Sequence, residues 1–438
     1  MIMTKIVCSS NTKWLNKQSS DSLKVLIYGT STENHGRPSI GSQLYHEIKH
    51  LEMRVPKKAF DLLTISMAVT AADTFIRRDE AEDGWSREID LTIAVTEPET
   101  WEPLVDCFEE ILLFLSGDIW RLTIIGEGPG APRPLRRNRR TRRIRVRDHD
   151  CVCLFSGGLD STIGVLDLIS SGHKPLLVSH SYAKDKEKQE FVARKLPVKL
   201  ERFAASANPV WTTQPHDDSM RTRSLNFIAY GVVMASILAR RNEMSKCNLY
   251  IPENGLISLN APLTPRRIGS LSTRTTHPHY IRSIQDIVSK LNLPITIINP
   301  YGFKTKGEML NSCLDQSTLG KVESETVSCG KWKRKNQQCG KCIPCIIRRS
   351  AFYKSGHIDK TNYQYMDLLK ALETEQDHDD LLAATLAVSR LKKGKIKFWV
   401  NASGPLPEDS DTRKLYHEVF LRGMNEIKSY LSHMDVLS

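Results

Sequence analysis

The 438-residue sequence has no apolar run long enough to cross a lipid bilayer. Its first residues are mixed and largely polar, and they lack the apolar segment of a secretory signal. These absences favour a cytoplasmic protein with no membrane partner. Apolar content of 40% and charged content of 26% are ordinary for a globular protein, and the length suits two or three domains.

Disulfides are not expected either, because a long chain without a secretory signal keeps its thiols reduced. Of the ten cysteines, four crowd into residues 329–345, whereas the other six are scattered and mostly have apolar neighbours. The crowded four are typical of a metal site. The six interpreted as inert thiols are Cys8, Cys107, Cys151, Cys153, Cys247 and Cys313.

Aromatic residues are absent where positive charge is densest. The net charge of +12 suits a nucleic-acid partner, because Lys and Arg neutralise phosphates. Much of the excess is nine arginines: Arg133, Arg136, Arg137, Arg139, Arg140, Arg142, Arg143, Arg145 and Arg147. This stretch has no aromatic side chain to stack on bases, so we prefer a solvated linker or strand edge to an anionic docking surface. Nucleic acid is therefore a less favoured partner.

Residues 1–148 are expected to form a strand-rich N-terminal domain that ends in this basic linker. The first fifty residues are weakly patterned and are interpreted as loops. The elements predicted after them are a buried strand at 62–69, a strand at 88–95, a helix at 101–115 and a strand at 120–125.

Residues 149–355 predict an α/β domain with a parallel sheet, and residues 356–438 a helical C-terminal extension. An apolar run at 151–155 is followed by Ser-Gly-Gly, a helical pattern and a second apolar run at 175–179. Strand, turn, helix and strand make one right-handed βαβ unit. The further elements are helices at 224–240 and 280–291 and strands at 249–252 and 295–299.

The turn after the first of these strands is a candidate phosphate loop. Backbone N–H groups at a helix start bind anions, and Gly157 and Gly158 let the backbone approach closely. The hydroxyls of Ser156 and Ser161 can donate to phosphate oxygens. The Walker lysine is absent, and Asp160 stands where a cation would be expected, so Asp160 would hold Mg²⁺ or orient the loop.

The crowded cysteines have the spacing C-x9-C-x2-C-x2-C, which suits tetrahedral Zn²⁺. Their four thiolates leave no open position, so the ion would be structural. Iron–sulfur ligation and redox-active thiols stay open as alternatives. The predicted ligands are Cys329, Cys339, Cys342 and Cys345.

Both motifs resemble known families. Residues 156–161 match the SGGxDS loop of N-type ATP pyrophosphatases (PP-loop enzymes), which hold the β and γ phosphates of ATP. Residues 326–329 and 339–352 resemble the end of the 7-cyano-7-deazaguanine synthase (QueC) family, and residues 221–227 resemble its Arg-Asn segment more loosely. The resemblance implies an adenine nucleotide alpha hydrolase-like domain that uses ATP, Mg²⁺ and Zn²⁺.

The resemblance also implies roles for single residues. Asp160, Ser161 and Lys306 would be catalytic, with Lys306 at the leaving pyrophosphate, although a plain surface lysine is the alternative. The implied nucleotide-binding residues are Ser156, Gly157, Gly158, Asp160, Ser161 and Arg223.

Four further residues are predicted to contact the substrate. Glu253 and Asn254 follow the strand at 249–252, where open α/β sheets bind ligands. His277 and His279 fall in a segment that departs from the family pattern, although a histidine satisfied by hydrogen bonds is the common alternative.

The implied reaction is adenylation of 7-carboxy-7-deazaguanine, followed by transfer of the acyl group to an amine. The N-terminal domain and the helical extension are foreign to the housekeeping enzyme, and they look like the QueC-like component of bacterial anti-phage systems of the Qat type. The amine would then be ammonia or belong to a protein of the same defence operon. Housekeeping nitrile synthesis, tRNA modification and a non-catalytic nucleotide-binding scaffold stay open as alternatives.

Overall fold

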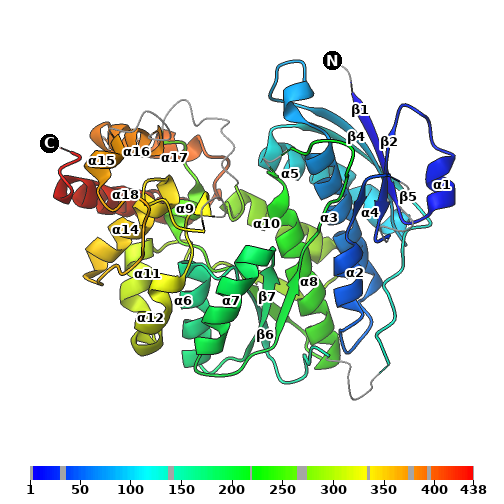
Figure 1. The fold of residues 1–438 in the computed structure, drawn as a ribbon. Helices are drawn as coiled ribbons and strands as arrows, with labels where there is room; N and C mark the ends of the chain where they lie inside the picture. Colours follow the sequence, from blue (N-terminus) through cyan, green and yellow to red (C-terminus); the bar gives the residue numbers. More distant parts are fainter. Residues whose placement is uncertain are drawn as a thin grey trace.

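The computed structural model describes residues 3–29, 36–136, 143–217, 220–263, 274–332, 336–372, 379–391 and 396–437. Four arginines of the basic stretch lie outside these ranges: Arg137, Arg139, Arg140 and Arg142. Within the described ranges, the chain forms two parallel five-stranded sheets flanked by helices (Figure 1). None of the described helices is both long and apolar enough to cross a membrane.

The N-terminal sheet has the strand order β3-β2-β1-β4-β5. Its strands are β1 (Thr4–Ser9), β2 (Leu23–Ile27), β3 (Ser39–Ile40), β4 (Glu88–Ala94) and β5 (Ile119–Ile125). Its helices are α1 (Thr12–Asn16), α2 (Ser42–Ile48), α3 (Lys57–Phe75), α4 (Pro98–Trp101) and α5 (Val105–Ser116). The strands predicted at 88–95 and 120–125 and the helix predicted at 101–115 are confirmed. The loops predicted over the first fifty residues are wrong, because three short strands lie there.

The strand predicted at 62–69 is also wrong, because these residues lie inside the helix α3. A short apolar run does not distinguish a buried strand from a buried helix, and α3 is buried on every side from Ala59 onward. Two of its threonines are satisfied within the helix: the Thr64 hydroxyl donates to Phe60 O at 3.0 Å, and the Thr70 hydroxyl donates to Ser66 O at 2.9 Å.

The second sheet has the order β10-β9-β6-β7-β8. Its strands are β6 (Cys151–Leu154), β7 (Pro175–His180), β8 (Arg202–Ala205), β9 (Cys247–Tyr250) and β10 (Ile295–Ile298). Its helices are α6 (Leu159–Ser170), α7 (Ala183–Lys195), α8 (Arg223–Arg241), α9 (Gly255–Leu259), α10 (Pro278–Lys290), α11 (Lys306–Ser312), α12 (Gln316–Val322) and α14 (Ile343–Ser355). The predicted βαβ unit is confirmed as β6-α6-β7. The chain runs outward from β6 to β8 and then returns to β9 on the other side. The end of β6 is therefore a topological switch point, where sheets of this kind bind ligands.

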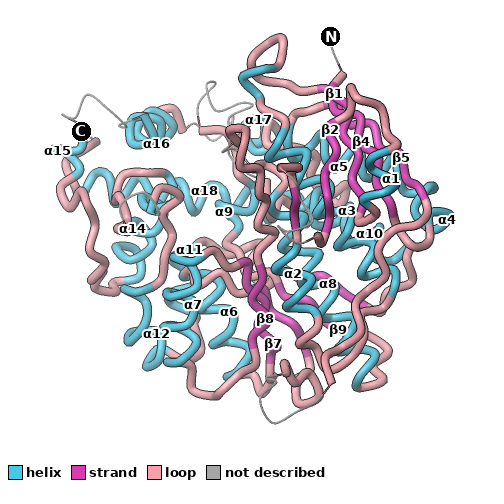
Figure 2. Tube along the Cα trace, turned by 45° about the vertical axis from the view of Figure 1, so that its right-hand side comes forward, coloured by secondary structure: helices cyan, strands magenta, loops and turns pink. Residues whose placement is uncertain are grey.

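The two sheets share one apolar core. Its buried residues include Leu91 of the first sheet, Val152 and Leu249 of the second, and many residues of α3 and α8. These two helices lie side by side between the sheets in both views (Figure 1 and Figure 2). The N-terminal part is thus packed against the second sheet and is not merely tethered to it.

A buried ion cluster reinforces this junction. Asp118 accepts hydrogen bonds from Arg78 at 2.6 Å and from Arg87 at 2.7 Å. Asp73 accepts one from Arg87 at 2.5 Å, and its other oxygen accepts from the Thr222 hydroxyl and backbone N–H, both at 2.8 Å. Because Thr222 directly precedes α8, the cluster fixes the start of that helix to the N-terminal sheet.

The C-terminal extension is helical, as predicted. It comprises α15 (Leu368–Leu372), α16 (Asp379–Ser389), α17 (Ile396–Asn401) and α18 (Ser410–His433). A separate apolar core joins them to α9 and α14. On α18, Val419, Met424, Ile427 and Leu431 are buried, whereas Leu415 is 41% exposed.

Candidate functional site

The loop between β6 and α6 requires both of its glycines. Gly157 has φ +75°, and a Cβ there would lie 3.0 Å from Cγ of Gln189. A Cβ on Gly158 would lie 3.0 Å from the carbonyl oxygen of Val327. Ser156 and Ser161 face each other, with 3.1 Å between their Oγ atoms. The loop therefore presents backbone N–H groups and two hydroxyls at the start of a helix, which fits a phosphate group.

Two residues from elsewhere in the chain hold this loop. The Gln189 side chain on α7 donates from Nε2 to the carbonyls of Ser156 and His180, both at 3.3 Å. Val327 N donates to Gly157 O at 3.3 Å. Neither residue was predicted. Gln189 lies in a highly charged helix, and only its burial distinguishes it there.

Asp160 is the centre of the site. It is buried in the first turn of α6, and its Oδ2 accepts from the backbone N of Asn254 at 3.1 Å and from the side-chain Nδ2 at 2.7 Å. Its Oδ1 accepts from Nζ of Lys306, the first residue of α11. Residues from three segments of the chain, predicted separately, thus meet at the carboxyl end of the sheet.

Charge is balanced within this cluster. Burial raises the pKa of Asp160, but the Lys306 ammonium and the hydrogen bonds outweigh burial and lower it to about 2. Burial and the neighbouring Asp160 charge raise the pKa of Glu253 well above its usual value. Asp160 is therefore ionised at neutral pH, and its charge together with burial favours the protonated form of Glu253. Because both oxygens of Asp160 already accept hydrogen bonds, the geometry favours loop orientation over Mg²⁺ binding for this residue.

The four predicted zinc ligands converge, and their sulfur atoms all lie within 4.8 Å of one another. Two of the Sγ–Sγ distances are 3.8 Å (Cys342–Cys329) and 4.0 Å (Cys339–Cys345). Tetrahedral Zn²⁺ with Zn–S bonds of about 2.3 Å requires sulfur atoms roughly 3.8 Å apart. Backbone N–H groups of Lys331 and Cys339 point at Sγ of Cys329 at 3.3 Å, which suits a thiolate. The cluster fits a structural zinc ion.

The zinc segment is connected to the phosphate loop. Gln338, next to the ligand Cys339, accepts from Ser328 N at 2.8 Å and donates to Thr326 O at 3.0 Å. Arg348, which is buried in α14, donates to the Thr326 hydroxyl at 2.8 Å. Val327 lies between these two anchored residues and contacts Gly157. An ion at the cysteines would therefore fix one wall of the phosphate loop.

Arg223 lies at the start of α8 and is exposed. Its charge acts on Tyr182, just beyond β7: burial raises the pKa of that hydroxyl, and Arg223 lowers it in part. The Tyr182 hydroxyl contacts Sδ of Met220 at 3.8 Å. Arg223 thus lies near the sheet edge that carries the phosphate loop, and its predicted nucleotide contact stays a prediction.

The two predicted substrate histidines lie elsewhere, beside Phe114 of α5. His277 caps α10, with Nδ1 accepting from His279 N at 3.2 Å and Nε2 3.1 Å from Ser403 Oγ. Burial, with help from the Arg274 charge, lowers the pKa of His277 to about 3. Both ring nitrogens of this neutral histidine thus have structural partners, and substrate binding by His277 and His279 stays a prediction.

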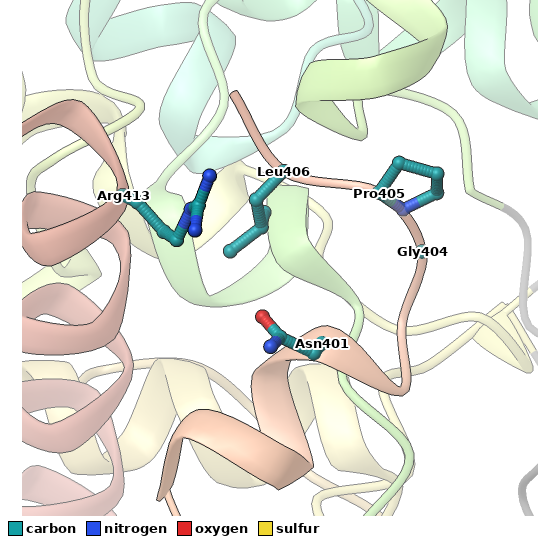
Figure 3. Close-up of a pocket in the computed structure, with 5 residues that line it drawn as sticks. All are labelled: Asn401, Gly404, Pro405, Leu406 and Arg413. Carbon is teal, nitrogen blue, oxygen red and sulfur yellow. The ribbon is translucent and has the colours of Figure 1, made fainter. Parts of the chain in front are cut away.

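A shallow hollow of about 430 Å³ borders this histidine pair. It lies between α17 and α18, and Figure 3 shows the side chains of Arg413, Leu406 and Asn401 around it. A Cβ on Gly404, which also lines it, would come within 3.2 Å of the His277 ring. The lining includes no residue of the phosphate loop, and Arg413 is engaged by the carbonyls of Pro407 and Glu408.

Comparison with known proteins finds a family similarity in a segment that contributes to the second sheet. Residues 275–356 match the family described as Queuosine biosynthesis protein QueC, and this segment includes Lys306 and all four cysteines. A 7-cyano-7-deazaguanine synthase of Polynucleobacter asymbioticus is 25% identical over 237 residues, which cover 49% of this chain and 91% of that protein. Together with the site geometry, these similarities support a QueC-like family for this chain.

Proposed function

We propose that the protein is an ATP-dependent enzyme of QueC type, which adenylates the carboxylate of a 7-deazaguanine and releases pyrophosphate. The observation that carries the proposal is the meeting of Asp160, Asn254 and Lys306 beside a loop shaped for phosphate. An anion cradle next to a buried lysine suits a reaction whose leaving group is an anion.

In this mechanism the loop N–H groups and the hydroxyls of Ser156 and Ser161 hold the β and γ phosphates. A carboxylate oxygen of the substrate attacks the α phosphorus, and the bond from that phosphorus to pyrophosphate breaks. Lys306 stabilises the charge that develops on the leaving group, while Asp160 holds Lys306 in place. ATP would supply the adenylyl group, and Mg²⁺ would neutralise charge on its phosphates.

In the second half of the reaction an amine attacks the acyl carbon, loses a proton, and AMP leaves. We propose ammonia or a protein amine as the nucleophile, the latter within bacterial antiviral defence. A protein acceptor is supported by the N-terminal sheet, which lies outside residues 275–356, the segment that matches the family. That sheet shares a core with the second sheet, so a partner bound on it would be held at a fixed place relative to the site.

Thiolation of tRNA is a weaker candidate. It requires a reactive cysteine near the site, and Cys313, which directly follows α11, is one candidate. Cys313 is packed in an apolar cluster, and burial raises its pKa to about 12. A thiol of this kind carries almost no thiolate at neutral pH and is a poor nucleophile.

The test is to incubate the protein with Mg-ATP and 7-carboxy-7-deazaguanine, with and without ammonium and the proteins encoded beside it. AMP, small products and intact protein masses are followed. Substrate-dependent AMP with a free amide or nitrile indicates a synthase, and a deazaguanine mass on a protein indicates a ligase. ATP binding without substrate-dependent AMP under any condition would overturn the proposal and favour a nucleotide-binding scaffold.

A further inference from the structure

The helix α11, which begins with Lys306, has a fully capped N-terminus. Thr305 caps α11 in a capping box: its Oγ1 accepts from Glu308 N at 3.1 Å, and Glu308 Oε2 accepts from Thr305 N at 2.8 Å. The hydroxyl proton of Thr305 remains available to a further acceptor. That acceptor is Oε1 of Glu426, 121 residues later on α18.

A second contact from α18 holds the other half of the capping box. Arg422, one turn before Glu426, donates from Nε to Glu308 Oε1 at 2.6 Å and from Nη2 to Phe303 O at 2.7 Å. A Cβ on Gly307 would lie only 2.8 Å from Glu426 Oε1, so glycine is needed for the carboxylate to come this close. Both residues of the box that sets the position of Lys306 are thus bound by α18.

The same helix supports the other partner of Asp160. Asn254 caps α9, and α9 packs directly on α18. A Cβ on Gly255 would lie 2.9 Å from the Val419 methyl groups, and a Cβ on Gly423 would lie 2.8 Å from a Leu256 methyl group. The helix α14, which carries the ligand Cys345, packs on α18 as well, as Figure 1 shows.

We infer that α18 is a structural component of the nucleotide site and that Glu426 is a positioning residue, which sets Lys306 for the reaction through Thr305. This inference rests on the proposed function for its kinetic consequences. The helix lies outside residues 275–356, the segment that matches the family.

The surroundings of Glu426 make the contact sensitive to pH. Burial, aided by the Glu308 charge, raises the pKa of Glu426 to about 7, while the bonds from Thr305 and Gly307 and the Lys354 charge oppose the rise. The charged groups that act on it are Glu308 on α11 and Lys354 on α14. The ionised carboxylate accepts stronger hydrogen bonds than the protonated one. The contact that holds α11 therefore tightens as the pH rises through 7.

The experiment uses the full-length protein and measures pyrophosphate release with ATP and 7-carboxy-7-deazaguanine, so that no amine takes part. Glu426→Ala and Thr305→Val are expected to lower kcat about tenfold to a hundredfold, because small displacements of catalytic groups cost this much. KM for the carboxylate should change by less than about twofold. Thr305→Ser should restore kcat. Glu426→Gln should abolish the rise in kcat through pH 7.

The control is Glu418→Gln on the same helix, where the side chain is 45% exposed and pairs with Lys414. A second readout does not depend on catalysis: labelling by an amine-reactive reagent, read by mass spectrometry. Lys306 is 5% exposed and should be protected in the native protein but labelled faster in Glu426→Ala. Unchanged labelling of Lys306 in Glu426→Ala would overturn the inference. Faster labelling in a protein without substrate-dependent AMP would support the contact and refute the proposed function instead.

Discussion

Replacing Lys306 by methionine tests the centre of the site, because it removes the ammonium and keeps most of the side-chain volume. Asp160 then loses its cation while it stays buried beside Glu253. Removing one partner of a buried ion pair typically costs about 3–5 kcal/mol of unfolding free energy. Asn254 still donates twice to Asp160, so we expect about 3 kcal/mol, the lower end of that range.

The loss of activity should be larger than stability alone explains. One preorganised group that stabilises developing charge is worth about 100-fold to 1000-fold in rate. Substrate-dependent AMP release should fall by that factor in Lys306→Met, measured under conditions where the variant is folded. The matched control is Lys304→Met, since Lys304 Nζ bonds the exposed Ser312 hydroxyl at 2.9 Å and lies outside the cluster. A Lys306→Met variant that releases AMP within about threefold of the native rate would refute the assigned role.

The same variant has a predicted pH signature. The pKa of Asp160 is lowered to about 2 from its ordinary 3.8, so its stabilising contribution is complete above pH 3.8 and is lost as the pH falls through 2. Lys306→Met lacks most of this contribution. The difference in unfolding free energy between the native protein and the variant should therefore narrow as the pH falls from 4 to 2, as measured by urea unfolding. A constant difference would show that Lys306 does not set the charge of Asp160.

Three further outcomes are expected. Cys345→Ser, or removal of the metal by a chelator, should lower the zinc content and weaken ATP binding about tenfold. The zinc segment anchors Val327, and Val327 contacts Gly157 of the phosphate loop. Gly157→Ala should weaken ATP binding by at least about tenfold in calorimetry while circular dichroism stays native, because φ is positive there and a Cβ would crowd Gln189 at 3.0 Å. Asp118→Ala should destabilise the protein to urea by about 3–5 kcal/mol, whereas Asp79→Ala, whose side chain is 62% exposed, should cost less than about 1 kcal/mol.

Local chemistry explains which features were predictable. The phosphate loop follows from six consecutive residues, and the zinc site from four cysteines within seventeen positions. The strands β6, β7, β9 and β10 of the second sheet follow from apolar runs bounded by turns, whereas β8 was not predicted. In contrast, residues 62–69 were assigned to a strand because an eight-residue apolar window carries no period that separates the two structures. These residues form a helix because α3 packs against α8, and a window of eight residues carries no information about that packing.

Long-range partners were invisible for a related reason. Gln189, Glu426 and Arg422 look like ordinary surface residues of polar helices, and only their contacts with the loop and with α11 reveal a role. His277 is a different case: this residue, predicted to contact the substrate, has both ring nitrogens engaged in structural contacts, and its substrate contact stays a prediction. Residue type and spacing therefore identify groups that act locally, whereas positioning residues require the fold.

The support for nucleotide chemistry comes from two signals that are separate in the sequence. The family match covers residues 275–356 and contains neither the phosphate loop nor Asn254. The fold brings the two together: Lys306 and Val327 from the matched segment contact Asp160 and Gly157 of the loop. If the loop served only as a turn, its contacts with Lys306 and Val327 would not be expected. Their contact therefore makes ATP binding at this edge of the sheet the simplest account of both signals.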